Sequence, residues 1–339
     1  MKQRVAILGA GSLGTIMGAR VSQNGGECTL IDTNKDHVNA LNKNGATVTG
    51  FLDIKNMPVK AITPDEMEGI YDIVFILTKQ TVNQKALPGL LKHLNEDSVV
   101  CTLQNGIPED SVSAIVGRDR TVGGAVGWGG GYISPGVSEL YTRPEFMIIE
   151  IGNLDNIIND KLKRTEDFLK LVGGVTINTN LIGFRWSKLL MNASLSGMSA
   201  ALGCTFGDIL DNDKAVVLAV SAANELIQVS RKIGITLEVI VPGKDFYTLA
   251  YTSEDELKTA ISFMREVWDV HRPQKASMLQ DMEKSIPCEI DYINGIVSKH
   301  GKENGISTPV NDKIVEIVKL FEKKEIPFPT MVNLERFEV

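Results

Sequence analysis

Near its start the chain reads Val5-Ala6-Ile7-Leu8-Gly9-Ala10-Gly11-Ser12-Leu13-Gly14. Four apolar residues followed by a Gly-x-Gly-x-x-Gly pattern predict a buried strand, a tight turn and the start of a helix. In a dinucleotide-binding unit Gly9 allows the turn, Gly11 lets the backbone approach a pyrophosphate, and Gly14 lets the helix pack on the strand. The N-terminus of the helix faces the anion. The stretch therefore predicts a nucleotide-binding strand and helix at the start of the chain.

A second apolar run supports this interpretation. Cys28-Thr29-Leu30-Ile31 ends in Asp32, about 20 residues beyond the glycines, where the ribose-binding acid of such units is expected. A carboxylate there accepts hydrogen bonds from both ribose hydroxyls and repels a 2′-phosphate, so Asp32 favours NAD(H) over NADP(H). The alternative is an ordinary turn aspartate in Asp32-Thr33-Asn34-Lys35, with Lys35 available to neutralise a phosphate.

Length and charge narrow the class of protein. The chain has 339 residues, of which 43% are hydrophobic, enough for a sizeable core and more than one domain. Its net charge of −7 comes without a long basic run, which argues against binding to nucleic acid or to an anionic membrane surface. No stretch matches a signal peptide or the roughly 20 apolar residues of a membrane span. We expect a cytoplasmic protein whose partners are small molecules.

The four cysteines are widely scattered along the chain. Cys28, Cys101, Cys204 and Cys288 show neither Cys-x-x-Cys nor Cys/His ligand spacing. They are typical of small apolar core residues in a reducing compartment, and they imply no metal site.

The order of apolar runs predicts an α/β fold with two domains. Strands are expected at Val5–Leu8, Cys28–Ile31, Ile73–Leu77 and Val99–Leu103, and their alternation with helical stretches indicates a doubly wound parallel sheet. Thr121–Val126, Val137–Tyr141 and Phe146–Ile151 are expected to extend that sheet with an antiparallel part. Long helical periods follow at Phe184–Leu202, Lys214–Ile233, Glu254–Val270, Ile290–Glu303 and Val310–Phe321. We predict a dinucleotide-binding domain over residues 1–180 and an all-helical domain over 181–339, with the cleft between them as the default ligand site.

Polar residues follow two of the expected strands. Thr78-Lys79 comes after Leu77, and Gln104-Asn105-Gly106 comes after Leu103. Because ligands bind at the carboxyl ends of such strands, Lys79 is a candidate to meet the charge of a cofactor or substrate, and Asn105 a candidate to hydrogen-bond near the nicotinamide. A solvated lysine and an Asn-Gly turn are the alternatives.

The helix expected over Phe184–Leu202 is too apolar for a surface helix, yet it carries polar residues at a helical spacing. Lys188, Asn192 and Ser196 recur at i, i+4 and i+8, which places an ammonium, an amide and a hydroxyl on one stripe. A stripe that lines a cleft can meet a polar substrate while the other faces pack. The wet side of a half-buried helix would show the same pattern.

A further candidate is Glu289, in the stretch 287–296. Helical spacing puts its carboxylate in line with the inward face of Ile293 and Ile296. Asp291, with Asn294 and Gly295, lies on another side, as expected for a solvent-facing helix surface. An inward carboxylate is either a partner of the helix dipole or an orienting group for a catalytic ammonium.

These segments together resemble the ketopantoate reductase (2-dehydropantoate 2-reductase) family over nearly the whole chain. The resemblance rests on motifs in a specific order: Gly9-Ala10-Gly11-Ser12-Leu13-Gly14, Thr78-Lys79, Leu103-Gln104-Asn105-Gly106, Lys188-Leu189-Leu190-Met191-Asn192, Ser277-Met278-Leu279-Gln280-Asp281 and Glu289-Ile290-Asp291-Tyr292-Ile293-Asn294-Gly295. It implies a Rossmann domain followed by a helical domain similar to the C-terminal domain of 6-phosphogluconate dehydrogenase. It also makes a homodimer possible, as in relatives.

The resemblance implies roles for individual residues. Lys188 is the proton donor to the keto oxygen of the substrate, and Glu289 lies beside the reacting centre, in contact with the cofactor. Asn105, Asn192 and Ser277 hold substrate or cofactor, and Lys79 lies on the nucleotide side. The chemistry is coherent, because hydride addition to a 2-keto carbonyl builds negative charge on oxygen, which an ammonium stabilises and protonates.

Three features depart from the pattern usual in the family. Ser196 stands where a second substrate-binding asparagine is usual, and its shorter side chain leaves room for a larger or less polar substrate group. Asp32 stands where members that use NADP commonly have a basic or neutral residue. The segment 241–272, with Trp268, His271 and Arg272, is longer than usual and precedes Ser277, so it is expected to reshape the substrate entrance.

The leading hypothesis is reduction of 2-dehydropantoate to (R)-pantoate, a step toward pantothenate and coenzyme A. The rival enzyme hypothesis is an NAD-dependent D-2-hydroxyacid dehydrogenase, similar to the D-mandelate dehydrogenases, that acts on a bulkier 2-keto acid; Asp32 and Ser196 lean toward it. A third hypothesis is a dinucleotide-binding protein without turnover. The joint presence of Lys188, Asn192 and Glu289 argues against the third, because a sensor needs no proton donor.

Overall fold

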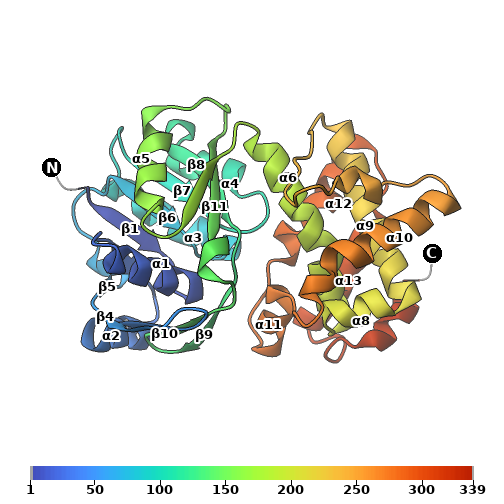
Figure 1. The fold of residues 1–339 in the computed structure, drawn as a ribbon, viewed down its shortest axis with the longest axis horizontal. Helices are drawn as coiled ribbons and strands as arrows, with labels where there is room; N and C mark the ends of the chain where they lie inside the picture. The colour runs from blue at the N-terminus through green and yellow to red at the C-terminus, as the bar shows by residue number, and fades with distance from the viewer. Residues whose placement is uncertain (1–2, 338–339) are drawn as a thin grey trace. The chain divides into compact units, whose positions relative to one another are not determined.

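The chain divides between Leu181 and Ile182 into two compact units. The computed structural model describes residues 3–337. Every strand among these residues belongs to the N-terminal unit, whereas the C-terminal unit is built from helices (Figure 1). This confirms the predicted fold class, an α/β domain with a doubly wound sheet followed by a helical domain.

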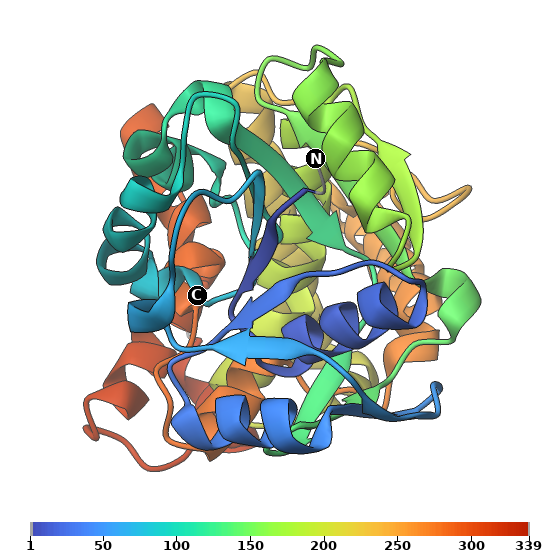
Figure 2. The ribbon, with the colours of Figure 1, turned by 90° about the vertical axis from the view of Figure 1, so that its left-hand side faces the viewer.

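The main sheet of the N-terminal unit has the strand order β12-β11-β8-β7-β6-β1-β2-β5. Figure 2 shows β1, β2 and β5 of this unit side by side in shades of blue. The strands are β1 Val5–Leu8, β2 Thr29–Ile31, β5 Lys60–Ile62, β6 Ile73–Ile76, β7 Val99–Thr102, β8 Thr121–Val126, β11 Ile148–Asn153 and β12 Gly174–Ile177. β11 pairs with β8 in the antiparallel sense, as predicted, and β1 lies between β2 and β6 in parallel. The strand order therefore reverses at β1, and such a switch point opens a crevice at the carboxyl ends of the strands.

The residues of β1 explain why helices cover both faces of this sheet. Val5 and Ile7 pack into a core shared with Ile16 and Met17 of α1 and with Phe168 of α5. The intervening residues Ala6 and Leu8 join a second core with Val112 of α4. A strand buried on both faces is apolar throughout, which is why β1 shows no polar alternation. The helices of this unit are α1 Ser12–Gln23, α2 Lys35–Asn44, α3 Asn83–Ala86, α4 Glu109–Val116 and α5 Asp160–Leu169.

A second, smaller sheet was not expected. Its order is β4-β3-β10-β9, with β3 Ala46–Gly50, β4 Ile54–Met57, β9 Gly130–Ser134 and β10 Val137–Leu140. The prediction that Val137–Tyr141 extends the main sheet is therefore wrong. β10 pairs instead with β3, which belongs to a short hairpin after α2 whose polar residues give no clear strand pattern. α1 contacts both β3 and β10, so it is covered by the small sheet as well as by the main one.

Helices make up the C-terminal unit. They are α6 Leu181–Met191, α7 Gly197–Leu202, α8 Phe206–Asp211, α9 Asp213–Lys232, α10 Glu254–Trp268, α11 Ser277–Glu283, α12 Asn294–Asn304 and α13 Pro309–Glu322. Asn212 and Ser253 explain where α9 and α10 begin, because each side chain caps the first turn by accepting a backbone N–H. The single helix predicted over Phe184–Leu202 is interrupted by a π-helical segment, η6 Asn192–Ser196.

In the segment 241–272, which precedes α11, Trp268 has a structural role. Trp268 is 1% exposed and stacks on Phe246 with ring centroids 5.6 Å apart. Within the segment 241–272, Trp268 is therefore a core residue, and the expectation that this segment reshapes the substrate entrance stays a prediction. Arg272 forms an ion pair with Asp211, the last residue of α8.

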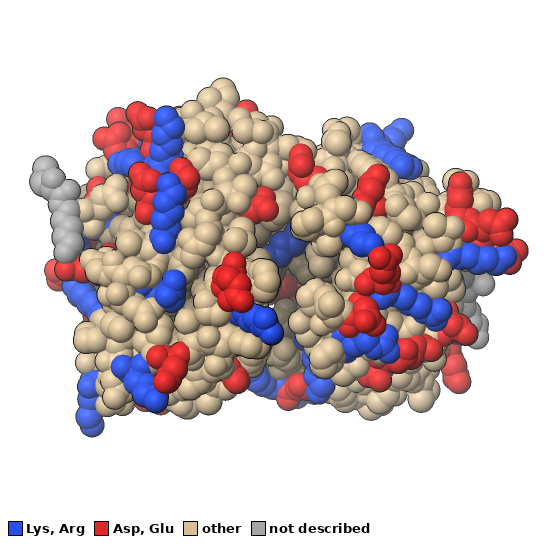
Figure 3. Space-filling view, viewed as in Figure 1, with Lys and Arg blue, Asp and Glu red and all other residues tan. Residues whose placement is uncertain are grey.

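No helix within residues 3–337 is both long and apolar enough to cross a membrane. On the face drawn in Figure 3, lysine and arginine side chains are interspersed with aspartate and glutamate. Mixed charges of this kind keep a surface hydrated without creating a strong field of one sign.

Candidate functional site

The glycine turn after β1 is built as the sequence predicts. Gly9 has a φ of +100°, and a Cβ at this position would lie 2.6 Å from the backbone nitrogen of Thr78. A Cβ on Gly14 would collide with the carbonyl oxygen of Gly9. Only glycine tolerates these two close approaches, so the turn, the helix and the loop after β6 pack directly on one another.

The space in front of Gly11 is open. A Cβ built on Gly11 would meet no described atom within 4 Å. Gly11 is the N-cap of α1, and neither a side-chain cap nor an acidic residue occupies the first turn of this helix. The first N–H groups of a helix have no acceptor within that helix, so the start of this twelve-residue helix suits an anion such as a pyrophosphate. Ser12 and Leu13, the first residues of α1, are half-buried, whereas Ala10 is fully buried.

Asp32 follows β2 and is half-buried. One of its carboxylate oxygens accepts the backbone N–H of Asn34 at 2.9 Å, so Asp32 stabilises the turn after β2. Its role toward the ribose stays a prediction. The pKa of Tyr132, on β9, is raised first by partial burial and then by the negative charges of Asp32 and Asp36. The two carboxylates therefore act on the same space beside β9.

The loops after β6 and β7 are tied together by Gln104. This side chain is 4% exposed, and its Nε2 donates to the carbonyl oxygen of Thr78 at 2.6 Å and to Oδ1 of Asn83 at 2.7 Å. Next to it, the carbonyl of Asn105 accepts from Nε2 of Gln80 at 2.5 Å. Lys79 and Asn105 are both half-buried beside this network. The loops that carry them are thus braced at the carboxyl edge of the sheet.

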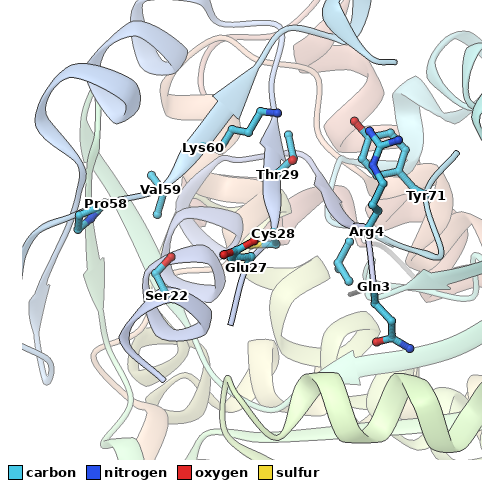
Figure 4. Close-up of a pocket in the computed structure, with 11 residues that line it drawn as sticks. Gln3, Arg4, Ser22, Glu27, Cys28, Thr29, Pro58, Val59, Lys60 and Tyr71 are labelled. Atoms are coloured by element: carbon cyan, nitrogen blue, oxygen red, sulfur yellow. The ribbon is translucent and has the colours of Figure 1, made fainter. Parts of the chain in front are cut away.

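A cavity of about 420 Å³ lies at the opposite edge of the sheet (Figure 4). It is lined by residues at the beginnings of the parallel strands, including Arg4, Glu27, Lys60 and Tyr71. The Arg4 guanidinium lies 4.9 Å from the centroid of the Tyr71 ring. Because this cavity is at the amino ends of the strands, it is separate from the glycine turn.

In the C-terminal unit the predicted stripe is present on α6 and η6. From Gly183 to Leu202 the partly exposed positions are Lys188, Met191, Asn192 and Ser196, and the other residues of that span are buried. Three of these four are the polar residues predicted from their spacing. On this otherwise buried helix, Lys188, Asn192 and Ser196 are therefore partly exposed along one narrow stripe.

Glu289 is buried, with 8% of its surface exposed, and lies in the turn before a short 3₁₀ helix, Ile290–Tyr292. The prediction that it points inward is consistent with this burial. The prediction for Asn294 is wrong, because Asn294 is fully buried rather than on a solvent-facing side. The physical reason is that a regular helix does not continue from Glu289; the 3₁₀ turn ends at Tyr292 and α12 begins afresh at Asn294. Asp291 is exposed, as predicted.

Ser277 is the exposed first residue of α11. The preceding Ala276 donates its N–H to Oγ of Ser199 on α7 at 3.3 Å, and α11 contacts η6. α11 therefore begins beside the helix that carries the stripe.

Sequence reasoning missed the buried polar residues that brace these segments, namely His37, Gln104, Asn294 and Asn311. Gln104 and Asn294 stand inside motifs that were recognised, but their side chains received no role or the wrong one. Their function depends on partners far along the chain, which no local spacing predicts.

Two family models and a relative of this chain point to one family. The model described as "Ketopantoate reductase PanE/ApbA" matches residues 5–155, and the model described as "Ketopantoate reductase PanE/ApbA C terminal" matches residues 180–322. A relative from Pyrococcus horikoshii, named 2-dehydropantoate 2-reductase, is 28% identical over 321 residues, which cover 94% of this chain and 97% of the relative.

Solved structures share the fold. A ternary structure of D-mandelate dehydrogenase with NADH and anilino(oxo)acetate is similar with a TM-score of 0.81 and 24% identity, covering 95% of this chain and 99% of the other. The dimeric ketopantoate reductase from Staphylococcus aureus gives a TM-score of 0.71 at 18% identity, covering 95% and 100%. At these identities the likeness concerns the fold alone.

Proposed function

Because the chain belongs to the ketopantoate reductase family, we propose that it reduces 2-dehydropantoate to (R)-pantoate with a hydride from NADH, and that Lys188 donates the proton. The observation that carries this proposal is the accessible stripe of Lys188, Asn192 and Ser196 on an otherwise buried helix. A structural helix has no need to keep an ammonium, an amide and a hydroxyl in line at its one open face.

The residues of the stripe suit carbonyl reduction. When bound, the nicotinamide supplies the hydride, which adds to the keto carbon. The ammonium of Lys188 stabilises the negative charge that develops on the keto oxygen and transfers a proton to it. Asn192 and Ser196 bind polar groups of the same substrate, and Ser277 contributes from the start of α11. Glu289, largely shielded from water, orients the ammonium and contacts the cofactor.

The N-terminal unit suits the dinucleotide. The open space at Gly11 receives the pyrophosphate, and Lys79 and Asn105 lie on braced loops at the same edge of the sheet. Asp32 accepts hydrogen bonds from the adenosine ribose and, together with Asp36, disfavours a 2′-phosphate. Both negative charges act in the region beside Tyr132, where they add to the effect of partial burial in raising the pKa of this residue.

A second candidate is an NAD-dependent D-2-hydroxyacid dehydrogenase that reduces a bulkier 2-keto acid. Ser196 favours it, because a hydroxyl in place of an asparagine amide leaves more room at the accessible stripe.

We further propose that the protein is a cytoplasmic homodimer. The dimeric relative of the same family supports this assembly, and light scattering on the purified protein measures it.

The deciding experiment is steady-state oxidation of NADH and, separately, NADPH with 2-dehydropantoate and with bulkier acids such as benzoylformate. A dominant kcat/KM for 2-dehydropantoate with NADH supports the first proposal. A dominant value for a branched or aromatic keto acid supports the second. NADH binding without turnover of any acid would contradict both and would leave a dinucleotide-binding protein.

A further inference from the structure

Asn294 joins two stretches of chain that carry proposed catalytic groups. Its side chain is fully buried at the start of α12. Nδ2 donates to the carbonyl oxygen of Ala193 and to Oδ1 of Asn311, both at 2.9 Å. Ala193 belongs to η6, and Glu289 lies five residues before Asn294. One amide thus bonds the stripe-bearing segment to the segment that begins at Glu289.

The orientation of that amide is determined by its neighbours. Nδ2 of Asn311 donates to the carbonyl oxygen of Ala222 at 3.1 Å and to Oε2 of Glu225 at 2.7 Å. The oxygen of the Asn311 amide is therefore the atom that faces Asn294. The two carboxylate oxygens of Glu225 also accept the backbone N–H groups of Val310 and Asn311 at 2.8 and 3.0 Å, so both act as acceptors here. Glu225 orients Asn311, and Asn311 orients Asn294.

The bond to Ala193 is made at the irregular part of the catalytic helix. A π-helical segment departs from the regular register of a helix, and such segments are frequent at functional sites. From inside the helix, Oγ of Ser194 donates to the carbonyl oxygen of Leu190 at 2.8 Å. Asn294 supplies a donor from outside. Gly197 leaves room for the Asn294 amide, since a Cβ there would clash with both Oδ1 and Nδ2 of that side chain.

We propose that Asn294 is a positioning residue for the reduction. Its amide, oriented by Glu225 through Asn311, holds η6 in the register that aligns Asn192 and Ser196 with Lys188, and holds the Glu289 turn beside them. This inference rests on the proposed function, because it assigns the reaction to these groups. The rotation of η6 sets the angle between the proton donor and the residues that bind the substrate.

The test replaces Asn294 by leucine, which has a similar size and no donor. Asn333→Leu is the matched control, because Nδ2 of Asn333 donates to the carbonyl oxygen of Ala201 on α7 at 3.0 Å and is also buried. The readouts are the single-turnover rate of NADH oxidation per folded protein, the Kd for NADH and the Tm.

We expect the single-turnover rate of Asn294→Leu to fall about 10- to 100-fold, since small misplacements of reacting groups cost that much. Its Kd for NADH should stay within about twofold of wild type, because most of the contacts proposed for the dinucleotide lie in the N-terminal unit and Glu289 is the one proposed here from the C-terminal unit. Asn333→Leu should have a lower Tm than wild type but the same single-turnover rate. Equal rates in the two variants, with an active wild type, would show that Asn294 is merely structural.

A second variant guards against failure of Asn294→Leu to fold. Gly197→Ala keeps the Asn294 amide but displaces it, so the rate should fall in the same way with NADH affinity retained. An unchanged rate in Gly197→Ala would overturn the positioning role. An inactive wild type toward every 2-keto acid would instead overturn the proposed function, and this inference with it.

Discussion

The Nε2 atom of His37 lies 2.8 Å from the carbonyl oxygen of Ala10, so a side chain of α2 holds the glycine turn from behind. The backbone N–H of Gly136 donates to Nδ1 of the same ring at 3.0 Å. Nδ1 is therefore the acceptor, and Nε2 carries the proton that Ala10 accepts. Thr15 donates to the same carbonyl at 2.6 Å. His37 is 1% exposed, and it links the glycine turn to the connection between β9 and β10 of the small sheet.

We expect His37→Leu to weaken NADH binding about tenfold, which corresponds to about 1.4 kcal/mol. The loss of the bond lets the Ala10 peptide move, and the neighbouring N–H groups that face the pyrophosphate move with it. Because the C-terminal unit is untouched, kcat at saturating NADH should be unchanged. Isothermal titration with NADH measures the effect.

His93→Leu is the matched control for His37. His93 is also buried, and its Nδ1 bonds the carbonyl oxygen of Gly69 at 2.9 Å, at the edge of the sheet away from the glycine turn. It should lose stability and keep its NADH affinity. An equal loss of affinity in both variants would show a general loosening of the unit.

Gly11→Ala should affect NADH binding without affecting the stability of the fold. A Cβ at Gly11 meets no described atom within 4 Å, so the Tm should stay within a few degrees of wild type. The methyl group projects into the space proposed for the pyrophosphate, and the Kd for NADH should rise at least tenfold, or about 1.4 kcal/mol.

Gly14→Ala should behave in the opposite way, because its Cβ collides with the Gly9 carbonyl. Overpacking of this kind costs about 1–3 kcal/mol of folding free energy, measured by urea denaturation. Gly89→Ala, where a Cβ also meets nothing within 4 Å, is the neutral control. For Gly11→Ala, by contrast, an unchanged Kd for NADH would contradict the proposed position of the pyrophosphate beside Gly11.

Lys188→Ala should fold normally and bind NADH with wild-type affinity. Its kcat should fall by about 10²- to 10⁴-fold, the usual contribution of a positioned proton donor. Lys214→Ala removes an exposed lysine at the start of α9 and should keep full activity. A kcat near wild type in Lys188→Ala would exclude this residue as the acid.

Asp32→Asn tests the cofactor preference without breaking the turn. An asparagine keeps the oxygen that accepts the N–H of Asn34 but removes the charge. We expect the ratio of kcat/KM for NADH over NADPH to fall about tenfold, because the repulsion of a 2′-phosphate is lost, at about 1.4 kcal/mol. Asp53→Asn, in an exposed ion pair with Lys55, should leave the ratio unchanged. If both variants keep the wild-type ratio, Asp32 is a turn residue only.

Ser196→Asn restores the residue that is usual in the family. The longer amide narrows the accessible stripe, so kcat/KM for 2-dehydropantoate relative to benzoylformate should rise severalfold. The KM for NADH, measured in the same assays, is the internal control. A ratio that does not move would mean that Ser196 does not contact the variable group of the substrate.

Local sequence patterns predicted several elements closely. β1 and β8 have the predicted bounds, and α10 begins at the predicted Glu254. The small sheet was missed because β3 and β4 are short and polar, and because the pairing of β10 with β3 joins residues about ninety positions apart in sequence. The break of the catalytic helix at η6 was missed because apolar periodicity continues through it.

By itself, the sequence determined the strand, turn and helix of the nucleotide unit and the line of Lys188, Asn192 and Ser196. These features depend on glycine sterics and on the helical repeat, which act between close neighbours. Only the tertiary structure decided that Asn294 is buried, that it bonds Ala193, and that His37 holds the glycine turn. A buried polar group must find a partner, and that partner is supplied by whichever distant segment the folded chain brings alongside it.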